Sequence, residues 1–549
     1  MTTTVQRHGA TRAVRPALDT GGRMARWWRL PSLPFRAYDG AISSAGGRLI
    51  LLVAVLSWAL LAGALRLLGL PVGGWLLAIW LQAGPGLVLV AAVGVRMWHR
   101  IAFYGIAASQ VLLVVLSFPP AYLTGQWYPR MATAALLVVT VTAAVFVLRR
   151  DWPDRARPGR PRTRILLVAV LSIGGLAVSV LAAWVRRGIP QPGGMAMTAG
   201  PLWFVGAALV LASLGLALVR GRSLALPVIS SSSVVVLGQA VMYGQPTVTV
   251  AARHLGMVDS VFRFSGLRPD QDIYQTWAGM FTATALVLWL AGPAVSSFTY
   301  AAFWGALAAP VMVLGVRVVA GRLMSHRAAW LAAGVFGLGS SLTTSFFAPQ
   351  VLAFVLCLAV LSLLLGVAPE APRLTVLRWG AVVALSGVII VTHQISPYML
   401  GFALGVLCLF RLVRPWWTPL VPLVPAAIWA IVNVEVLTRY VDPETFGRLL
   451  SNLTPPQHPD APTGVALINR LTFMVPALAL ILIGILALFV LFRRHDRRSW
   501  GLAATAASPM LLAVGTNYGQ EGVFRIALFS LPWLAMLCAV GLDHVQGPR

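Results

Sequence analysis

The chain has 549 residues, of which 58% are hydrophobic and only 10% charged, and its formal net charge is +27. A soluble domain carries about 25% charged residues, and apolar runs of roughly 18 or more residues are long enough to cross a bilayer. This composition excludes a soluble enzyme, a disordered tail and a fibrous protein. It also excludes an outer-membrane barrel, because the runs are continuous rather than alternating.

The first part of the chain is interpreted as a tail followed by a membrane scaffold. Residues 1–46 are polar and rich in arginine and predict a cytoplasmic tail, and residues 47–222 predict about six membrane helices. The six apolar runs are 49–70, 74–95, 101–118, 131–148, 165–185 and 200–219.

A change in composition near residue 223 predicts a second part, 223–541, which we interpret as the catalytic module. Its first run, 223–243, precedes a polar stretch at 244–276, and the following segment, 277–292, is short for a crossing and predicts a surface or re-entrant helix. Nine runs follow, at about 299–320, 328–345, 350–366, 376–392, 397–413, 418–438, 472–492, 499–515 and 523–541. The sequence thus predicts an all-α polytopic membrane protein with about sixteen spans, outer loops at 244–298 and 439–471, and a second tail at 542–549.

The distribution of charge predicts the orientation. All basic residues are arginines, which favours a bacterial source, and most lie in loops on the side of the two termini, as in 149–164 and 493–498. Cytoplasmic loops of membrane proteins carry such an excess. We therefore expect a multi-pass protein of the bacterial cell membrane with both termini cytoplasmic. The charge needs no nucleic-acid partner.

The three cysteines, Cys357, Cys408 and Cys538, lie inside apolar runs without the spacing of metal ligands. They predict small core residues and neither a disulfide framework nor a metal site. No phosphate-binding loop or dinucleotide glycine motif is present, so no cofactor is expected.

The predicted topology places nearly all unusual polar residues on the outer face. Polar groups at the ends of apolar helices are costly unless hydrated or paired, so a group of them indicates a water-filled cavity. The candidates in chain order are His254, Asp259, Arg263, Asp270, Asp272, Gln350, His393, Gln394, Tyr518, Glu521 and Arg525.

Asp259 is the candidate catalytic residue. It lies in the segment 253–263, five residues after His254 and four before Arg263, so a helix there brings Asp259 and Arg263 onto one face. A carboxylate beside an aqueous pocket serves as a general base toward a sugar hydroxyl. An ordinary solvated ion pair of Asp259 with Arg263 is the alternative that the residues leave open.

Asp270 and Asp272 form a close acid pair just before Tyr274. Carboxylate oxygens are the ligands that hard divalent cations prefer. Two acids without further fixed ligands are also what a helix N-cap requires, and capping of a helix over 275–292 is the favoured interpretation. The sequence predicts no essential metal.

Two further candidate groups lie where predicted helices begin. Pro349 and Pro397 are suited to the first turn of a helix, and they stand beside Gln350 and beside the pair His393–Gln394. The histidine is suited to bind a phosphate or a sugar hydroxyl, and the amides to bind sugars. A structural cap by the histidine is the alternative.

The last helix is preceded by Tyr518 and Glu521 and carries Arg525 in its first turn. A guanidinium binds the phosphate of a lipid-linked substrate well, whereas Glu521 and Arg525 at i, i+4 also suit a salt bridge. The loop 439–471, with its prolines and acids, is a candidate flap over the pocket.

The sequence resembles the GT-C superfamily of polytopic glycosyltransferases, and more closely bacterial members of that type. The segments that carry the resemblance are His254 to Asp259, Asp272 to Phe281, Phe347 to Gln350, Thr392 to Pro397 and Glu521 to Arg525. It covers about residues 223–541. The family's catalytic acid lies in the first large outer loop, a place that Asp259 fills here, and its outer-surface helix matches 275–292. The chain departs from the family in that seven spans precede this acid and no adjacent acid pair is present.

The resemblance implies an extracytoplasmic transferase that moves a sugar with inversion from a polyprenyl-phosphate donor to a cell-envelope glycan, lipid or protein. Asp259 would act as base, and Arg525, with Arg263 or His393, would stabilise the leaving phosphate. Residues 47–222 would contact membrane lipid or a membrane protein partner. A polymerase or ligase acting on lipid-diphosphate-linked polysaccharide, and a transporter or assembly scaffold, remain as alternatives.

Overall fold

A computed structural model describes residues 45–95, 97–149, 166–188, 194–221, 223–340, 345–366, 372–440, 448, 463–515 and 522–545. Every regular element over these residues is a helix, which confirms the predicted all-helical class. Eleven of the described helices are long and apolar enough to cross a membrane. The described residues therefore have the make-up of a multi-pass membrane protein.

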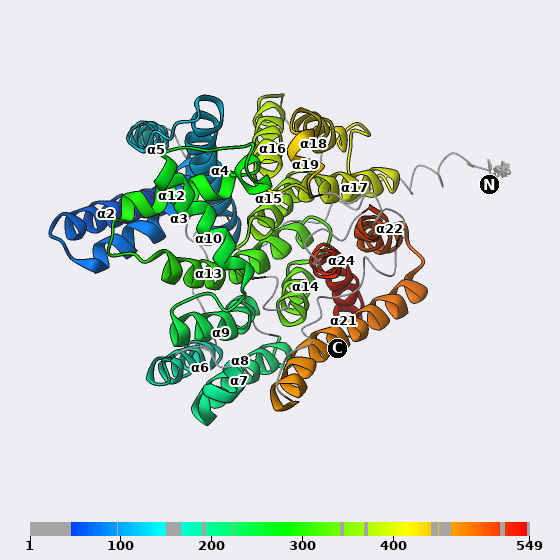
Figure 1. Cartoon of the computed structure of the whole chain (residues 1–549). Coiled ribbons are helices and arrows are strands. Elements are labelled where there is room, and N and C mark those ends of the chain that lie inside the picture. Colours follow the sequence, from blue (N-terminus) through cyan, green and yellow to red (C-terminus); the bar gives the residue numbers. More distant parts are fainter. Residues whose placement is uncertain are drawn as a thin grey trace, which may run out of the picture. The chain divides into compact units, whose positions relative to one another are not determined.

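The helices before residue 223 pack in two groups (Figure 1). In the first group α3 contacts α2, α4 and α5, and in the second α6 contacts α8 and the later helix α9. Gly175 on α6 faces Gly206 on α8, where a Cβ on either residue would collide with the other helix, so glycine allows the two backbones to approach closely. The bounds are α2 Ala45–Leu67, α3 Pro71–Val93, α4 Trp98–Thr124, α5 Pro129–Arg149, α6 Leu166–Val185, α7 Met195–Thr198 and α8 Gly200–Val219.

The remaining helices are arranged around α13, which contacts α4, α9, α14 and α15. Near the C-terminus, α24 packs against α14, α21 and α22 (Figure 1). The bounds are α9 Ala225–Tyr243, α10 Val250–Phe264, α11 Ile273–Thr276, α12 Gly279–Ala291, α13 Ser297–Ala320, α14 His326–Gly339, α15 Pro349–Leu364, α16 Pro372–Thr392, α17 Ser396–Leu409, α18 Leu420–Val432, α19 Val434–Leu437, α21 Thr463–Arg494, α22 Arg497–Ala507, η5 Ser508–Met510, α23 Leu511–Gly515 and α24 Gly522–Val545.

Local sequence explains where several of these helices begin. Ser325 caps α14 by accepting a hydrogen bond from the backbone N–H of Ala328, and Asp496 caps α22 in the same way through Ser499. Pro349 is the first residue of α15 and Pro397 the second of α17, as predicted, because proline has no N–H to leave unsatisfied there.

The predicted number of spans is matched only in part. Each of the sixteen predicted runs coincides with a helix, but α14, α15, α17, α18 and α22 have 14, 16, 14, 13 and 11 residues. At 1.5 Å per residue none of these five covers a hydrocarbon core of about 30 Å by itself. Sixteen crossings, and the side on which each terminus lies, stay predictions.

The segment predicted as a surface or re-entrant helix, 277–292, corresponds mainly to α12. This helix has 13 residues, and those from Gly279 to Leu288 are all buried; its place at the membrane surface or within the membrane stays a prediction. A helix that is apolar around its whole circumference is stable only when it is enclosed on all sides, and α12 packs against α3, α4 and α10. Its shortness and burial agree with the re-entrant alternative.

The predicted boundary near residue 223 does not separate two compact units, since residues 39–549 form one. Helix α4 packs against α12, α13, α15 and α16. A buried chain of hydrogen bonds crosses the boundary: Gln110 donates to the Gln82 side-chain oxygen at 2.7 Å, and Gln82 donates to the Tyr300 hydroxyl at 2.8 Å. The first helices therefore share one core with the predicted module, and a division of function at 223 remains a prediction.

Candidate functional site

Helix α10 separates two of the predicted site residues onto opposite faces. His254 lies on the buried face with Leu255 and Val258, and it is 3% exposed. Asp259 lies on the exposed face and forms an ion pair with Arg263 at 2.7 Å, with side chains 55% and 73% exposed. The pair at i, i+4 is the solvated arrangement that the sequence left open as the alternative to a catalytic role. A catalytic role for Asp259 stays a prediction.

The His254 ring is fixed by its surroundings. Its Nδ1 lies 2.8 Å from the backbone oxygen of Phe347, and the ring packs against Tyr274, Phe281 and Phe346 with centroids 5.3 to 6.2 Å away. Because a carbonyl only accepts, Nδ1 carries the proton and Nε2 of the neutral ring is an acceptor. Burial lowers the pKa of His254 from 6.5 to about 4, so the ring is neutral near pH 7.

Arg525 on α24 and Gln350 on α15 join two helices that are distant in sequence. The Nε of Arg525 donates to the Gln350 side-chain oxygen at 3.2 Å, and both residues are buried. One turn further along each helix, Phe354 and Phe529 meet edge to face with centroids 5.1 Å apart. The aromatic contact therefore holds the two helices in the register that pairs Arg525 with Gln350.

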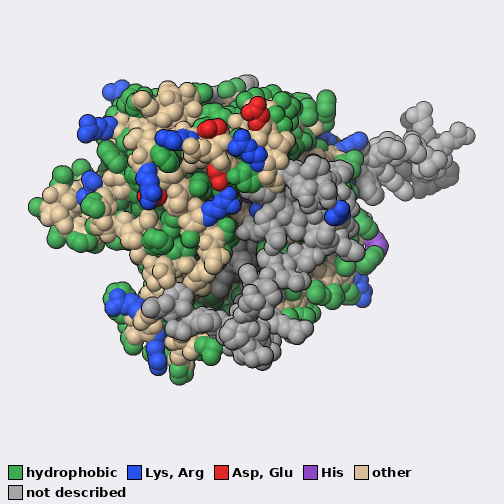
Figure 2. Space-filling model, viewed as in Figure 1, with side chains coloured by type: hydrophobic (Ala, Val, Ile, Leu, Met, Phe, Trp, Pro, Cys, Tyr) green, Lys and Arg blue, Asp and Glu red, His purple; other side chains and the backbone are tan. Residues whose placement is uncertain are grey.

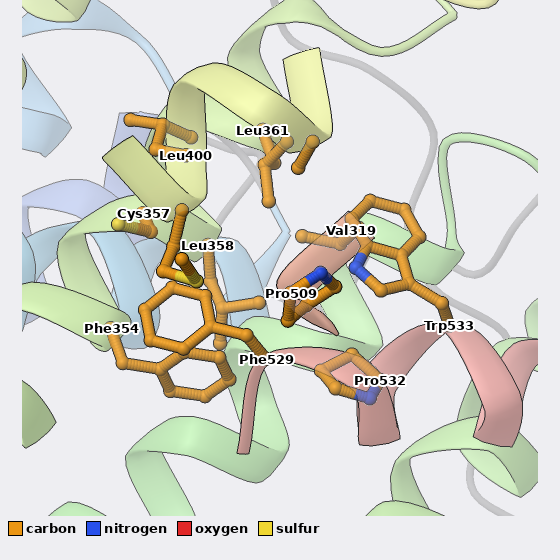
Figure 3. A pocket seen from close by; sticks show the side chains of 12 residues that line it. Val319, Phe354, Cys357, Leu358, Leu361, Leu400, Pro509, Phe529, Pro532 and Trp533 are labelled. Atoms are coloured by element: carbon orange, nitrogen blue, oxygen red, sulfur yellow. The ribbon is translucent and has the colours of Figure 1, made fainter. Parts of the chain in front are cut away.

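Phe354 and Phe529 also line a small pocket together with Cys357 and Trp533 (Figure 3). Its volume of about 10 Å³ is close to the minimum that a single water molecule occupies. It is a packing void with apolar walls. It is not a substrate site.

His393 occupies the turn between α16 and α17. The backbone N–H of Ser396 donates to its Nδ1 at 3.2 Å, and the Ser396 hydroxyl lies 2.8 Å from the same atom. A backbone N–H can only donate, so Nδ1 accepts and the neutral ring carries its proton on Nε2. Burial and the nearby charge of Arg525 lower the pKa of His393, which keeps it neutral. The two histidines thus have opposite tautomers.

Four of the predicted residues, His254, Gln350, His393 and Arg525, come together; we call them the polar cluster. Arg525 lies close enough to both histidines to act on them electrostatically, and the histidines act on each other. Gln394, next in sequence to His393, is 9% exposed, and its amide nitrogen has no hydrogen-bond partner in the structure. The polar cluster combines a guanidinium, an acceptor nitrogen, an N–H donor and amide groups inside an apolar bundle.

Asp272 stands at the edge of the polar cluster. It caps the short helix α11 by accepting from the Tyr274 N–H at 2.8 Å, and it forms an ion pair with Arg253 at 3.0 Å. The sequence predicted capping of a helix over 275–292, but α11 ends at Thr276, and α12 begins at Gly279 without a side-chain cap. The Arg253 guanidinium lies over the Tyr274 ring at 4.9 Å, and that ring contacts His254. Asp270 is exposed on the same loop. Figure 2 shows acidic side chains gathered among arginines on one part of the visible face.

Two adjoining cavities lie beside the polar cluster, and we call them the α9–α13 groove. The larger, about 160 Å³, is lined by α9, α13 and α14, and the smaller, about 30 Å³, by the end of α9, residues 245–248, α13 and residues 345–347. They share Val236 and Ser345. The smaller cavity includes Phe346 and Phe347, which also contact His254. The groove therefore extends from α9, α13 and α14 to Phe346 and Phe347, which border the polar cluster.

Two predicted residues and the predicted flap cannot be placed. Tyr518 and Glu521 lie outside the described residues, as does most of the loop 439–471. In the part that is described, α21 begins at Thr463, and Arg439 donates to the backbone oxygen of Asp270 at 2.8 Å.

Phe346, Phe347 and Arg253 are not among the site residues that the sequence predicts, although Phe347 lies in a segment that carries the resemblance. Phe346 and Phe347 contribute a ring and a carbonyl to His254, and Arg253 links Asp272 to Tyr274. Their signal was present, since two phenylalanines precede the helix-starting Pro349 and an arginine stands next to the buried histidine. Among the described residues, no group of three or more metal-ligating side chains comes together.

Comparisons with protein-family models, with curated proteins and with solved structures give no match.

Proposed function

We propose that the protein is an extracytoplasmic glycosyltransferase of the GT-C type, which moves a sugar with inversion from a polyprenyl-phosphate donor to a glycan, lipid or protein of the bacterial cell envelope. The proposal includes both termini on the cytoplasmic side and the polar cluster on the outer side.

The convergence of the polar cluster beside the α9–α13 groove is the observation that carries this proposal. The four residues come from α10, α15, the α16–α17 turn and α24, so their meeting requires the whole fold. A lipid-linked sugar offers an anionic phosphate, hydroxyls that donate and accept, and a long apolar chain. The cluster supplies a cation, an acceptor and donors, and the groove supplies apolar walls with scattered hydroxyls.

In this proposal the guanidinium of Arg525 binds the phosphate that leaves with the lipid. A guanidinium in a dry site stabilises developing negative charge, and its hydrogen bond to Gln350 fixes its orientation before substrate arrives. His393, which carries its proton on Nε2, adds a neutral donor. His254, with its acceptor Nε2, suits a sugar hydroxyl.

The reaction needs a carboxylate that takes the proton of the acceptor hydroxyl. The hydroxyl oxygen bonds to the anomeric carbon on the face opposite the phosphate, and the bond to the phosphate oxygen breaks. We assign the base to Asp272 rather than Asp259. Asp272 is linked through Arg253 and Tyr274 to His254, whereas Asp259 lies on the exposed face of α10. The role that the sequence gives to Asp259 is the competing assignment.

Sugar transfer by the purified protein in vesicles tests the proposal. The donors are radiolabelled polyprenyl-phosphate hexoses and pentoses with matching diphosphate-linked glycans, and the acceptor is a cell-envelope fraction. We expect transfer from a monophosphate donor, and its loss in Arg525→Gln. Arg268→Gln is the matched control, since Arg268 lies exposed over Phe264 just after α10, and it should transfer at the wild-type rate.

Transfer from diphosphate-linked donors alone would replace the proposal by a polymerase or ligase. No transfer from any donor, with protein that is folded by gel filtration, would contradict it.

A further inference from the structure

A second cluster of basic side chains lies at the opposite end of α13 from the polar cluster. Tyr300, near the start of α13, contacts Phe347, whose carbonyl bonds to His254. Arg317 lies 17 residues further on, which is about 26 Å along a helix at 1.5 Å per residue. We call Arg317 together with His99 and Arg100 of α4 and His326 of α14 the basic cluster.

Arg317, His99 and His326 of the basic cluster come from three helices and are in contact. The Arg317 guanidinium donates to Nδ1 of His326 at 2.8 Å and lies 5.4 Å above the ring of the buried Trp330. The His99 ring is 6.3 Å from both His326 and Trp330. Arg100 is close enough to repel Arg317 and His99. Two indole rings, of Trp98 and Trp330, stack against one another beside them.

Arg317 carries a charge that the described residues do not balance. It is 3% exposed, and its Nε has no hydrogen-bond partner. Both ion pairs between described residues, Arg253–Asp272 and Asp259–Arg263, are at the other end. The described acid close to this end, Asp496, caps α22 through Ser499. A buried cation is costly without a counter-charge, and none of the acids that the structure describes supplies one to Arg317.

The position of the basic cluster suits the phosphate of a lipid. It lies where α4 begins and α13 ends, and both helices are long enough to cross a membrane. The ends of such helices lie at the depth of lipid headgroups. Trp98, 40% exposed beside His99, is the kind of residue enriched at that depth. The N-terminus of α14, at His326, adds the partial positive charge of a helix start.

We propose that the basic cluster binds the phosphate group of an anionic phospholipid. Arg317 and Arg100 bind the phosphate by charge, and His326 and the first turn of α14 supply neutral donors. This site is separate from that of the sugar donor and goes beyond the proposed transferase activity. A lipid bound there joins α4, α13 and α14, so its phosphate stabilises the fold at the end where these three helices meet.

Native mass spectrometry of the detergent-purified full chain tests the proposal, with phosphatidylglycerol, phosphatidylcholine and inorganic phosphate each titrated separately. We expect phosphatidylglycerol to bind at least tenfold more tightly than phosphatidylcholine, which has no net charge. Arg317→Gln should remove that preference. Arg187→Gln deletes the same charge near the end of α6, where Arg187 lies over Trp184, and should retain the preference.

Arg100→Gln serves as a second variant, because Arg100 is only half-buried and its loss is less disruptive should Arg317→Gln fail to fold. It should lower the affinity for phosphatidylglycerol severalfold. Binding of inorganic phosphate without a preference for phosphatidylglycerol would overturn the lipid assignment. Equal binding of the two lipids by the wild type, or an undiminished preference in both variants, would overturn the site.

Discussion

A buried arginine lies near each end of α13, Arg525 at one and Arg317 at the other, and the two have different surroundings. At one end, Arg525 donates to Gln350 and lies near two histidines whose hydrogen bonds fix opposite tautomers. At the other end, the Arg317 guanidinium donates a hydrogen bond to His326 and lies over the Trp330 ring, while its Nε has no hydrogen-bond partner. In our proposals the first arrangement is pre-organised for a substrate, and the second binds a structural lipid.

The largest expected effect concerns the carboxylate beside the polar cluster. Asp272→Asn should lower the rate of sugar transfer by about 10² to 10⁴, the range for loss of a general base. Asparagine is as good an N-cap as aspartate, so α11 keeps its cap. The change also breaks the ion pair with Arg253, and Arg253→Gln, which breaks that pair but keeps the carboxylate, separates the two effects. Initial rates at saturating donor measure it.

Asp259→Asn is the matched comparison, with the same chemical change on the exposed face of α10. It should lower the rate by less than tenfold. A larger loss in Asp259→Asn than in Asp272→Asn would return the base to the position that the sequence favoured.

Substitutions in the packing around the polar cluster should lower the transfer rate nearly as much. Phe354→Ala removes a buried ring that meets Phe529 one turn from Gln350 and Arg525, and large-to-small changes of this kind cost about 3 to 5 kcal/mol. We expect a lower thermal midpoint together with a lower transfer rate. Phe336 is a second buried ring, which stacks on Phe354 from α14. Phe336→Ala tests whether the loss of rate is specific to Phe354: it should lower the thermal midpoint with a smaller effect on the transfer rate.

Lowering the pH should lower the free energy of unfolding through the buried histidines of the polar cluster. The pKa of His254 is about 4 in the folded chain against 6.5 when unfolded. Between these values the unfolded chain binds more protons, so stability falls as the pH is lowered from 6.5 to 4, by up to about 3 kcal/mol. His393, whose pKa is also lowered, acts in the same direction.

His254→Gln should flatten this dependence in thermal unfolding at a series of pH values. An unaltered slope in His254→Gln would mean that the ring is not buried as a neutral group.

The smallest expected effects are changes in stability on replacing each of the two buried arginines. In phosphatidylcholine nanodiscs, Arg525→Met should cost about 1 to 3 kcal/mol, because Gln350 is left buried without its partner. Arg317→Met should be neutral or stabilising under the same conditions, since it removes a buried charge that zwitterionic lipid does not balance. Thermal midpoints measure both. Equal destabilisation by the two changes would remove the distinction between the ends.

Sequence predicted the all-helical class, and it named four residues that the structure brings together in the polar cluster. His254, Gln350, His393 and Arg525 are rare polar side chains at the ends of apolar runs, and such residues are costly unless they meet. Asp259 was harder to place, because spacing alone shows its pair with Arg263 but not which face of α10 is buried. That face was encoded in the apolar His254–Leu255–Val258 side of the helix.

The number of spans was less predictable for a physical reason. Hydropathy counts apolar residues whether or not they are helical, and the run 328–345 extends past Gly339, where α14 ends. In the same way the run 499–515 contains Pro509, and the helix is interrupted there by η5. The sequence did not predict the basic cluster, because a count of charges does not show that Arg317, inside an apolar run, is buried.

Binding of unsugared polyprenyl phosphate to the wild type, Arg525→Gln and Arg317→Gln, each in phosphatidylglycerol-containing nanodiscs, tests the central claim most directly. We predict that Arg525→Gln weakens binding at least tenfold and that Arg317→Gln changes it far less, because the donor's phosphate belongs to the polar cluster. Weakening by Arg317→Gln alone, or equal binding by all three proteins, would contradict the claim that the polar cluster is the site of the lipid-linked donor.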